Sequence, residues 1–127
     1  MRVLVVDDIL TNRTLTARIL EKRGHCVKTV ENGKAAIEQL EKEDFDIVLM
    51  DVHMPVMDGI EATRIIRNHA SSVRKHDVPI IAVSAAAGSD GKKLCMEAGM
   101  CEYLSKPLRA DVFVAAVERY ASGAPGR

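Results

Sequence analysis

The sequence predicts an α/β fold, a doubly wound five-stranded parallel sheet covered on both faces by five helices. Short apolar runs alternate with segments of helical periodicity along the whole chain, which is typical of successive βαβ units. The runs at 3–6, 47–50 and 80–83 contain no polar residue, so these strands should be buried on both faces. Right-handed crossovers between such strands favour the strand order 2-1-3-4-5.

The first half of the chain supplies two strands and two helices of this pattern. The strand at 3–6 leads into a helix expected over 11–23, which Gly24 ends. The buried stripe of that helix should be Leu15, Ile19 and Leu20. The strand at 26–30 is more polar and therefore belongs at an edge of the sheet. Asn32 is expected to cap the next helix, whose apolar positions are Ala35, Ala36, Ile37 and Leu40.

The second half repeats the alternation after the buried strand at 47–50. Pro55 prevents a simple continuation of that strand, and Asp58 with Gly59 begins a helix. The apolar stripe of this helix is Ile60, Ile65 and Ile66. The polar segment 68–77 is the longest predicted loop. The remaining predicted elements are a strand at 80–83, a helix at 90–98, a strand at 102–104 and a helix at 111–121.

Length and composition restrict the class of protein. The 127 residues suffice for one continuous core, and we expect one domain over 1–121 with a disordered tail at 122–127. A formal net charge of zero and the lack of about 18 successive apolar residues argue against direct nucleic-acid binding and membrane insertion. The chain enters a strand at once, so we expect no secretory signal and a cytoplasmic location.

The three cysteines of the sequence do not form a recognisable site. Cys26, Cys95 and Cys101 are an odd set and lack a CxxC spacing. A small oxidised scaffold normally has a denser, even set of cysteines. We therefore expect buried or half-buried reduced thiols that bind no metal.

Polar residues follow the apolar runs at matching positions. Asp7 and Asp8 follow the strand at 3–6, and Asp51 follows the strand at 47–50. Ser84 and Lys106 stand after the last two strands. Because parallel strands finish at one edge of a sheet, these five side chains should converge on one crevice.

Three carboxylates in one crevice require a cation, because like charges at short distance repel one another. The expected ligands are hard oxygens, without a suitably spaced histidine or cysteine, which favours Mg²⁺ over zinc or a calcium cage. A competing interpretation of Asp7 and Asp8 is capping of the helix that follows them. One acid would be enough for that role, so the pair together with Asp51 favours the metal site.

Four segments resemble the CheY-like receiver domains of two-component response regulators. They are VLVVDD, DIVLMDVHMPVMDG, PIIAVSA and YLSKP, and the resemblance covers nearly the whole chain. It implies a flavodoxin-like fold, with 1–121 as a receiver domain. It also implies that Asp51 accepts a phosphoryl group from a phosphohistidine of a histidine kinase or histidine phosphotransfer domain. The phrase DVHMPVMDGIEATRIIR resembles receivers of hybrid sensor kinases as closely as free-standing regulators.

The resemblance also implies roles for the remaining site residues. It assigns the Mg²⁺ to Asp7, Asp8, Asp51 and the main-chain carbonyl of His53. Lys106 would contact the phosphoryl oxygens, and Ser84 would hydrogen-bond to one of them. Tyr103 would turn inward with Ser84 as a switch, biasing a surface formed by the fourth helix, the fifth strand and the fifth helix. Similar receivers often have a cis peptide bond before the proline matching Pro107, which would aim the lysine inward, but the sequence leaves this isomer open.

A few positions need separate interpretation. The His53 side chain is expected to modulate hydrolysis of the phosphorylated form without acting as a base. Ile9 stands where many similar receivers have asparagine, so Thr11 is a possible replacement cap. Asp58 is interpreted as a helix cap. The other histidines, His25, His69 and His76, are expected to be exposed.

Three other functions compete with a phosphoacceptor signalling domain that is not an enzyme. A phosphatase or phosphotransferase with an aspartyl nucleophile would also use these residue types. A nucleotide- or flavin-binding domain shares the fold class, but the loop 7–11 contains no glycine that would admit a phosphate. A module that binds partners without phosphorylation would be expected to lack part of the site.

Overall fold

The computed structural model of the chain describes residues 1–85 and 89–121. Strands and helices alternate through these residues, as the sequence predicts. The elements are β1 (Arg2–Val6), α1 (Leu10–Lys22), β2 (Cys26–Val30), α2 (Gly33–Lys42), β3 (Ile47–Asp51), α3 (Gly59–Arg67), β4 (Ile80–Ser84), α4 (Ser89–Ala98), β5 (Glu102–Ser105) and α5 (Ala110–Ala121). The predicted disorder of the tail concerns residues outside the described part of the chain.

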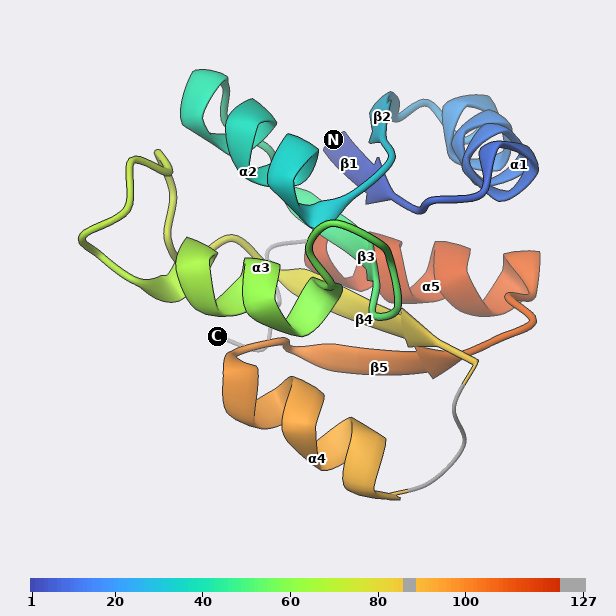
Figure 1. Cartoon of the computed structure of the whole chain (residues 1–127). Helices are drawn as coiled ribbons and strands as arrows, with labels where there is room; N and C mark the ends of the chain where they lie inside the picture. The colour runs from blue at the N-terminus through green and yellow to red at the C-terminus, as the bar shows by residue number, and fades with distance from the viewer. Residues whose placement is uncertain (86–88, 122–127) are drawn as a thin grey trace.

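The sheet has the predicted order β2-β1-β3-β4-β5, and every neighbouring pair is parallel (Figure 1). Val6 lies opposite Met50, and Asp51 lies opposite Val83. The carboxyl ends of β1, β3 and β4 are therefore level with one another. The more polar strand β2 lies at an edge, which confirms its predicted place.

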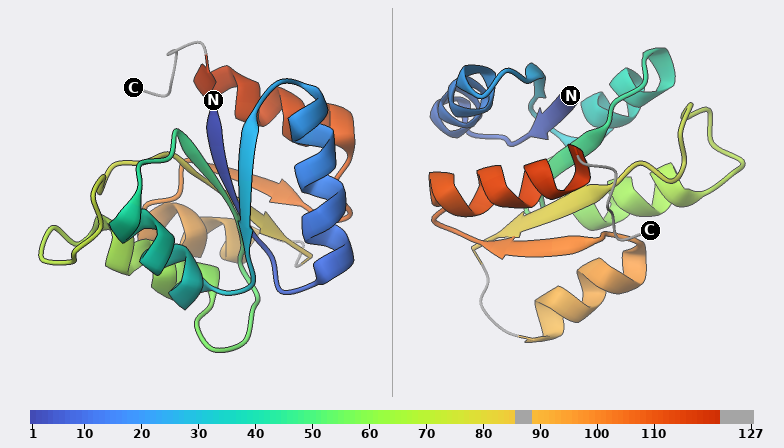
Figure 2. Two further views of the ribbon diagram at one scale, coloured as in Figure 1. Left: turned by 90° about the horizontal axis from the view of Figure 1, so that it is seen from above. Right: turned by 180° about the vertical axis from the view of Figure 1, so that it is seen from behind.

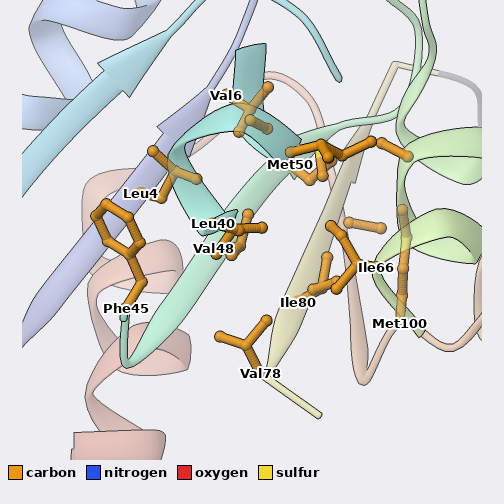
Figure 3. Packing of buried hydrophobic residues seen from close by; sticks show 14 of the residues in the cluster. Leu4, Val6, Leu40, Phe45, Val48, Met50, Ile66, Val78, Ile80 and Met100 are labelled. Carbon is orange, nitrogen blue, oxygen red and sulfur yellow. The ribbon is translucent and has the colours of Figure 1, made fainter. Parts of the chain in front are cut away.

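Successive residues of the central strands point to opposite faces and build two separate cores. One core joins Leu4, Val48 and Ile80 to the helices α2, α3 and α4 (Figure 3). The other joins Val3 and Leu49 to α1 and α5. Figure 2 shows these two layers of helices from two further directions. Because both faces are covered, the central strands carry successive apolar residues, at 3–6, 47–50 and 80–83.

The buried stripe of α1 differs from its prediction. Thr16 and Leu20 are buried, whereas Leu15 is 61% exposed. Residues four apart lie on one helix face, so the pair Thr16 and Leu20 defines the line of contact with the sheet. Leu15 precedes Thr16 by one position and is therefore rotated toward solvent. The prediction for Leu15 was wrong because an apolar residue at the margin of a stripe resembles one at its centre.

Two histidines and one cysteine also differ from expectation. The side chain of His25 is only 9% exposed and lies 3.0 Å from Glu118 of α5. His76 is half-buried, with Nδ1 2.9 Å from the carbonyl oxygen of Ile66. Cys26 is exposed, while Cys95 is buried and Cys101 is half-buried. Each difference arises from contacts with residues distant in the sequence or from the open side of the edge strand β2.

No helix in the described ranges is both long enough and apolar enough to cross a bilayer.

Candidate functional site

The three predicted acids meet at the carboxyl edge of the sheet. Asp7 and Asp8 directly follow β1, and Asp51 is the last residue of β3, the strand beside it. One carboxylate oxygen from each residue lies within 4.8 Å of the other two. Asp7 and Asp51 are buried, while Asp8 is exposed. The group therefore opens to solvent on the side of Asp8.

The chain leaves β1 through a turn that Asp7 itself organises. Asp7 Oδ1 accepts a hydrogen bond from the Ile9 N–H at 2.9 Å, which is an Asx-turn. The carbonyl of Asp7 accepts a second bond from Arg13 Nη1 at 2.8 Å. Helix α1 begins at Leu10 after Ile9, and no side chain caps it. Neither acid caps the helix, and the expectation that Thr11 would do so was wrong because Thr11 lies within it.

Lys106 reaches the acids from the end of β5. Its Nζ lies 2.9 Å from Asp51 Oδ2 and 3.9 Å from Asp7 Oδ2. The Lys106 N–H donates to the carbonyl of Ser84 at 2.8 Å, which joins the ends of β5 and β4. The peptide bond between Lys106 and Pro107, whose isomer the sequence leaves open, is cis.

Burial and charge shift the pKa of both partners of this ion pair. Burial raises the pKa of Asp51 more than the hydrogen bond and charge of Lys106 lower it, and the charge of Asp7 adds to the rise. Burial lowers the pKa of Lys106, but its bond to Asp51 and the nearby carboxylates outweigh burial and raise it. Lys106 is therefore a firmly charged ammonium. Asp51 is a carboxylate whose negative charge is incompletely compensated.

The other predicted residues lie at or near the same edge. Ser84 is buried as the last residue of β4, one position beyond the partner of Asp51. His53 is exposed, and its N–H donates to Asp51 Oδ1 at 3.2 Å. Tyr103 is half-buried earlier on β5, where it packs against the core on the α3 and α4 side. The structure therefore gathers Ser84 and Lys106 at the edge with the acids, whereas Tyr103 lies nearer the start of β5, away from that edge.

Two neighbours of the site have defined structural roles. Asp58 accepts a hydrogen bond from the Glu61 N–H at 2.8 Å, which confirms its predicted role as a helix cap. A Cβ at Gly59 would lie 2.5 Å from the carbonyl oxygen of Asp51, so only glycine fits there. The sequence shows an Asp-Gly pair at this point but does not show that α3 begins against the end of β3. Arg13 was likewise missed, because its bond to Asp7 depends on the turn between β1 and α1.

The donor set fits a hard divalent cation. The cluster offers carboxylate oxygens from Asp7, Asp8 and Asp51, and the exposed side leaves room for water ligands. No cysteine or histidine joins these acids in a metal-binding group within residues 1–85 and 89–121. Such a set is suited to Mg²⁺ and unsuited to zinc.

An apolar groove leads away from the acids between α1 and α5. Its cavity is about 650 Å³, with Asp7 and Lys106 at one end and Leu15, Ile19 and Phe113 among the apolar lining. Leu15 of this lining and the nearby Ile9 and Leu10 expose about half or more of their surface, at 61%, 47% and 65%. Adjacent exposed apolar side chains of this kind often mark a protein interface.

Comparison with known proteins agrees with this geometry. The family model described as "Response regulator receiver domain" matches residues 3–118. The sensor protein GacS of Pseudomonas syringae pv. syringae is 43% identical over 107 residues, which are 84% of this chain and 12% of GacS. The hybrid signal transduction histidine kinase M of Dictyostelium discoideum is 40% identical over 108 residues, again 84% of this chain but 4% of that kinase. The chain thus spans a small part of these relatives.

A solved structure is also similar over nearly its full length. It is the receiver domain of the sensor histidine kinase PA1611 from Pseudomonas aeruginosa PAO1, crystallised with a magnesium ion coordinated in the active site cleft. The two chains are 34% identical with a TM-score of 0.84, and the match covers 95% of this chain and 97% of that one.

Proposed function

Because this chain belongs to the family of response regulator receiver domains, we propose that it accepts a phosphoryl group on Asp51 and thereby relays a two-component signal. The observation that carries the proposal is the meeting of Asp7, Asp8 and Asp51 at one sheet edge, with Lys106 paired to Asp51. Residues 1–121 form the proposed signalling unit. The unit acts as a phosphoacceptor and not as a phosphatase.

The proposed reaction moves the phosphoryl group from a phosphohistidine to Asp51. A carboxylate oxygen of Asp51 attacks phosphorus in line, forming an O–P bond while the N–P bond to the imidazole breaks. The departing imidazole keeps the electron pair of that bond and takes up a proton from solvent. Lys106, held 2.9 Å from Asp51, is positioned to neutralise charge on the transferring oxygens.

Mg²⁺ is the proposed cofactor. When bound, it supplies positive charge that offsets the three carboxylates and the phosphoryl oxygens. The residues that would hold it are Asp7, Asp8, Asp51 and the main-chain carbonyl of His53. The exposed His53 side chain stands two positions after the acceptor, where it can modulate access of water to the acyl phosphate.

The proposed donor is a histidine kinase or a histidine phosphotransfer domain. The exposed apolar residues Ile9, Leu10 and Leu15 border the acidic site, so a partner that buries them brings its phosphohistidine toward Asp51. The three cysteines, Cys26, Cys95 and Cys101, are free thiols, which supports a reducing cytoplasmic location.

Ser84 and Tyr103 are the proposed switch. Ser84 is buried at the end of β4, where its hydroxyl can bond to a phosphoryl oxygen on the neighbouring strand. Tyr103 lies two positions before the end of β5 and near α4, since a Cβ at Gly91 would lie 3.7 Å from its hydroxyl. Phosphorylation is proposed to shift the population of conformers at the α4, β5 and α5 surface, to which a downstream partner binds.

Acetyl phosphate provides a direct test. The protein is incubated with acetyl phosphate and Mg²⁺, and its intact mass is measured with and without a chelator. We expect one phosphoryl adduct on the wild type and on the exposed control Asp44→Asn, but none on Asp51→Asn or after chelation. An adduct of equal yield on Asp51→Asn would contradict the assignment of the acceptor.

A further inference from the structure

The loop between β3 and α3 connects the proposed phosphoacceptor, Asp51, to α3. On its way it contacts the first residue of α2. It covers residues 52–58 and is closed at its base by a hydrogen bond from the Gly59 N–H to the Val52 carbonyl at 2.9 Å. His53, whose carbonyl belongs to the proposed metal ligands, lies at the start of this loop. The conformation of the loop therefore bears directly on the proposed function, on which this inference rests.

The tip of the loop is strained. The Met57 N–H donates to the Pro55 carbonyl at 2.7 Å, and Val56 between them has a φ of +70°. This is the rare γ-turn with positive φ, and a β-branched residue is a genuine outlier there. The Val56 side chain is 75% exposed, so its own packing does not compensate the strain. Another contact must hold the turn in place.

Helix α2 supplies that contact through its first residue. The Gly33 N–H donates to the Met57 carbonyl at 3.1 Å, and the loop lies beside the start of α2 in both Figure 1 and the left view of Figure 2. The first N–H groups of a helix have no partner within the helix. Asn32 caps α2 by accepting from the Ala35 N–H at 2.8 Å, which leaves the Gly33 N–H for the loop.

Glycine is required at this position for space. A Cβ on Gly33 would lie 2.8 Å from the Met57 carbonyl oxygen and 2.9 Å from the Cβ of Ala62. A backbone oxygen cannot turn away as the end of a flexible side chain can. Any larger residue must therefore push the loop or the helix out of position.

We propose that Gly33 is a positioning residue for the acidic site: its contact with Met57 holds the β3–α3 loop in its strained turn and thereby sets the Mg²⁺ affinity. The coupling is reciprocal, so Mg²⁺ binding must also strengthen the contact between Gly33 and Met57. The neighbours of Gly33, Met57 and Ala62, are not among the proposed metal ligands, so Gly33 acts through the loop.

The first test compares Gly33→Ala with Gly24→Ala. Mg²⁺ affinity of the metal-free proteins is measured by isothermal titration calorimetry, and folding is checked by circular dichroism. We expect Gly33→Ala to weaken Mg²⁺ binding about tenfold, the usual size of a defect in groups that support metal ligands. Gly24 has a φ of +92° with nothing within 4 Å of an added Cβ, so Gly24→Ala strains the fold without touching the loop. This control should lose thermal stability but keep the wild-type affinity.

A rescue variant separates positioning from general destabilisation. Glycine adopts positive φ without strain and also permits other turn conformations. Val56→Gly in the Gly33→Ala background should therefore let the loop move away from the added Cβ and recover a large part of the lost Mg²⁺ affinity. Val56→Gly in the Gly24→Ala background should leave Mg²⁺ affinity unchanged. Independent effects of positions 33 and 56 on affinity would contradict the proposed contact.

Amide hydrogen exchange of the wild type tests the coupling without any substitution. Mg²⁺ should slow exchange of the Gly33 amide more than that of the Gly24 amide, which is bonded to the Glu21 carbonyl at 3.0 Å, because general stabilisation of the fold does not favour Gly33 over Gly24. A Gly33 amide that is slowed no more than the Gly24 amide, or a folded Gly33→Ala protein with wild-type affinity, overturns the inference alone. If Gly33→Ala does not fold, the exchange result decides. A wild type that neither binds Mg²⁺ nor forms the phosphoryl adduct overturns the proposed function instead.

Discussion

Single residues at the acidic site carry opposing charges in a small volume. The carboxylates of Asp7, Asp8 and Asp51 face the one ammonium of Lys106, which leaves a formal charge of −2 when all four groups are ionised. Two like charges about 4 Å apart repel by about 1 kcal/mol in water and about 4 kcal/mol near a protein surface. The metal-free protein therefore keeps its most buried acid, Asp51, at a cost in stability.

Asp51→Asn should stabilise the metal-free protein at pH 7. Because the pKa of Asp51 is raised in the folded state, ionisation of its carboxyl disfavours folding. This unfavourable contribution is absent below the pKa that Asp51 has in the unfolded chain. It grows as the pH rises and is fully present above the raised pKa of the folded state. We expect urea unfolding to give a gain of about 1 kcal/mol at pH 7, the lower end of the repulsion between such charges. The gain should fall toward zero in acid.

The exposed acid Asp44 provides the matched control for this measurement. Asp44 lies in the loop before β3, away from the carboxyl edge of the sheet, and pairs with Arg74. Asp44→Asn should change stability little, because exposed ion pairs contribute little. A destabilised Asp51→Asn at pH 7 would mean that the pair with Lys106 outweighs burial and repulsion.

At the scale of elements, two arginines join segments that are distant in the sequence. Arg23 at the end of α1 pairs with Glu118 of α5 at 2.7 Å, and His25 contacts the same carboxylate. The bonds from Arg23 and then from His25 hold the pKa of Glu118 at about 2. Arg67 at the end of α3 donates to the Gly99 carbonyl at 3.0 and 2.8 Å through two nitrogens.

The second arginine is the stronger structural link, because it is half-buried and bonds to backbone carbonyls. Arg67 also donates to the His76 carbonyl at 2.7 Å, so it connects α3 with the 68–79 segment and the turn after α4. Burial lowers the pKa of its guanidinium, and the nearby Cys101 and Asp77 partly oppose that shift. Gly99, with a φ of +112°, leaves the space that the arginine occupies.

Arg67→Lys should destabilise the fold although it preserves the charge. A lysine has no planar fork of donors and cannot reproduce three bonds to two carbonyls. Hydrogen bonds that involve a charged group contribute about 1.5 to 3 kcal/mol, so a loss of about 2 kcal/mol is expected in urea unfolding. Arg64→Lys on the exposed side of the same helix should be nearly neutral. Equal unfolding midpoints for Arg67→Lys and Arg64→Lys would show that the buried bonds contribute little.

For the whole molecule, one sheet carries both cores and ends at the acidic site. Strands β1, β3 and β4 contribute residues to the cores on both faces, and their carboxyl ends present Asp7, Asp51 and Ser84. A ligand that binds only this assembled edge must stabilise the entire fold, since the unfolded chain does not hold the acids together.

Mg²⁺ should therefore raise the thermal unfolding temperature of the wild type. At a concentration about 100 times its dissociation constant, one bound ion contributes about 2.7 kcal/mol. Asp8→Ala removes the exposed acid of the cluster and should abolish most of this increase. KCl at matched ionic strength serves as the control for screening of charge. An equal increase with KCl would indicate screening instead of a metal site.

The sequence was sufficient to predict the strand order and the residues that gather at the sheet edge. Three apolar runs are followed directly by Asp7, Asp51 and Ser84. Parallel strands place such ends together at one edge of the sheet. The predictions for this part of the molecule depend on local periodicity and on one general rule of topology. The fold class, the edge position of β2 and the meeting of the three acids were therefore predicted correctly.

Only the tertiary structure decided which side chains near these elements are covered and what the loops contact. Leu15 is exposed and His25 is nearly buried, because each depends on the rotation of α1 and the approach of α5. The contact of Gly33 with Met57 joins residues that the sequence separates by a helix and a strand. Periodicity describes one element at a time, whereas burial and close approach are properties of the packing between elements.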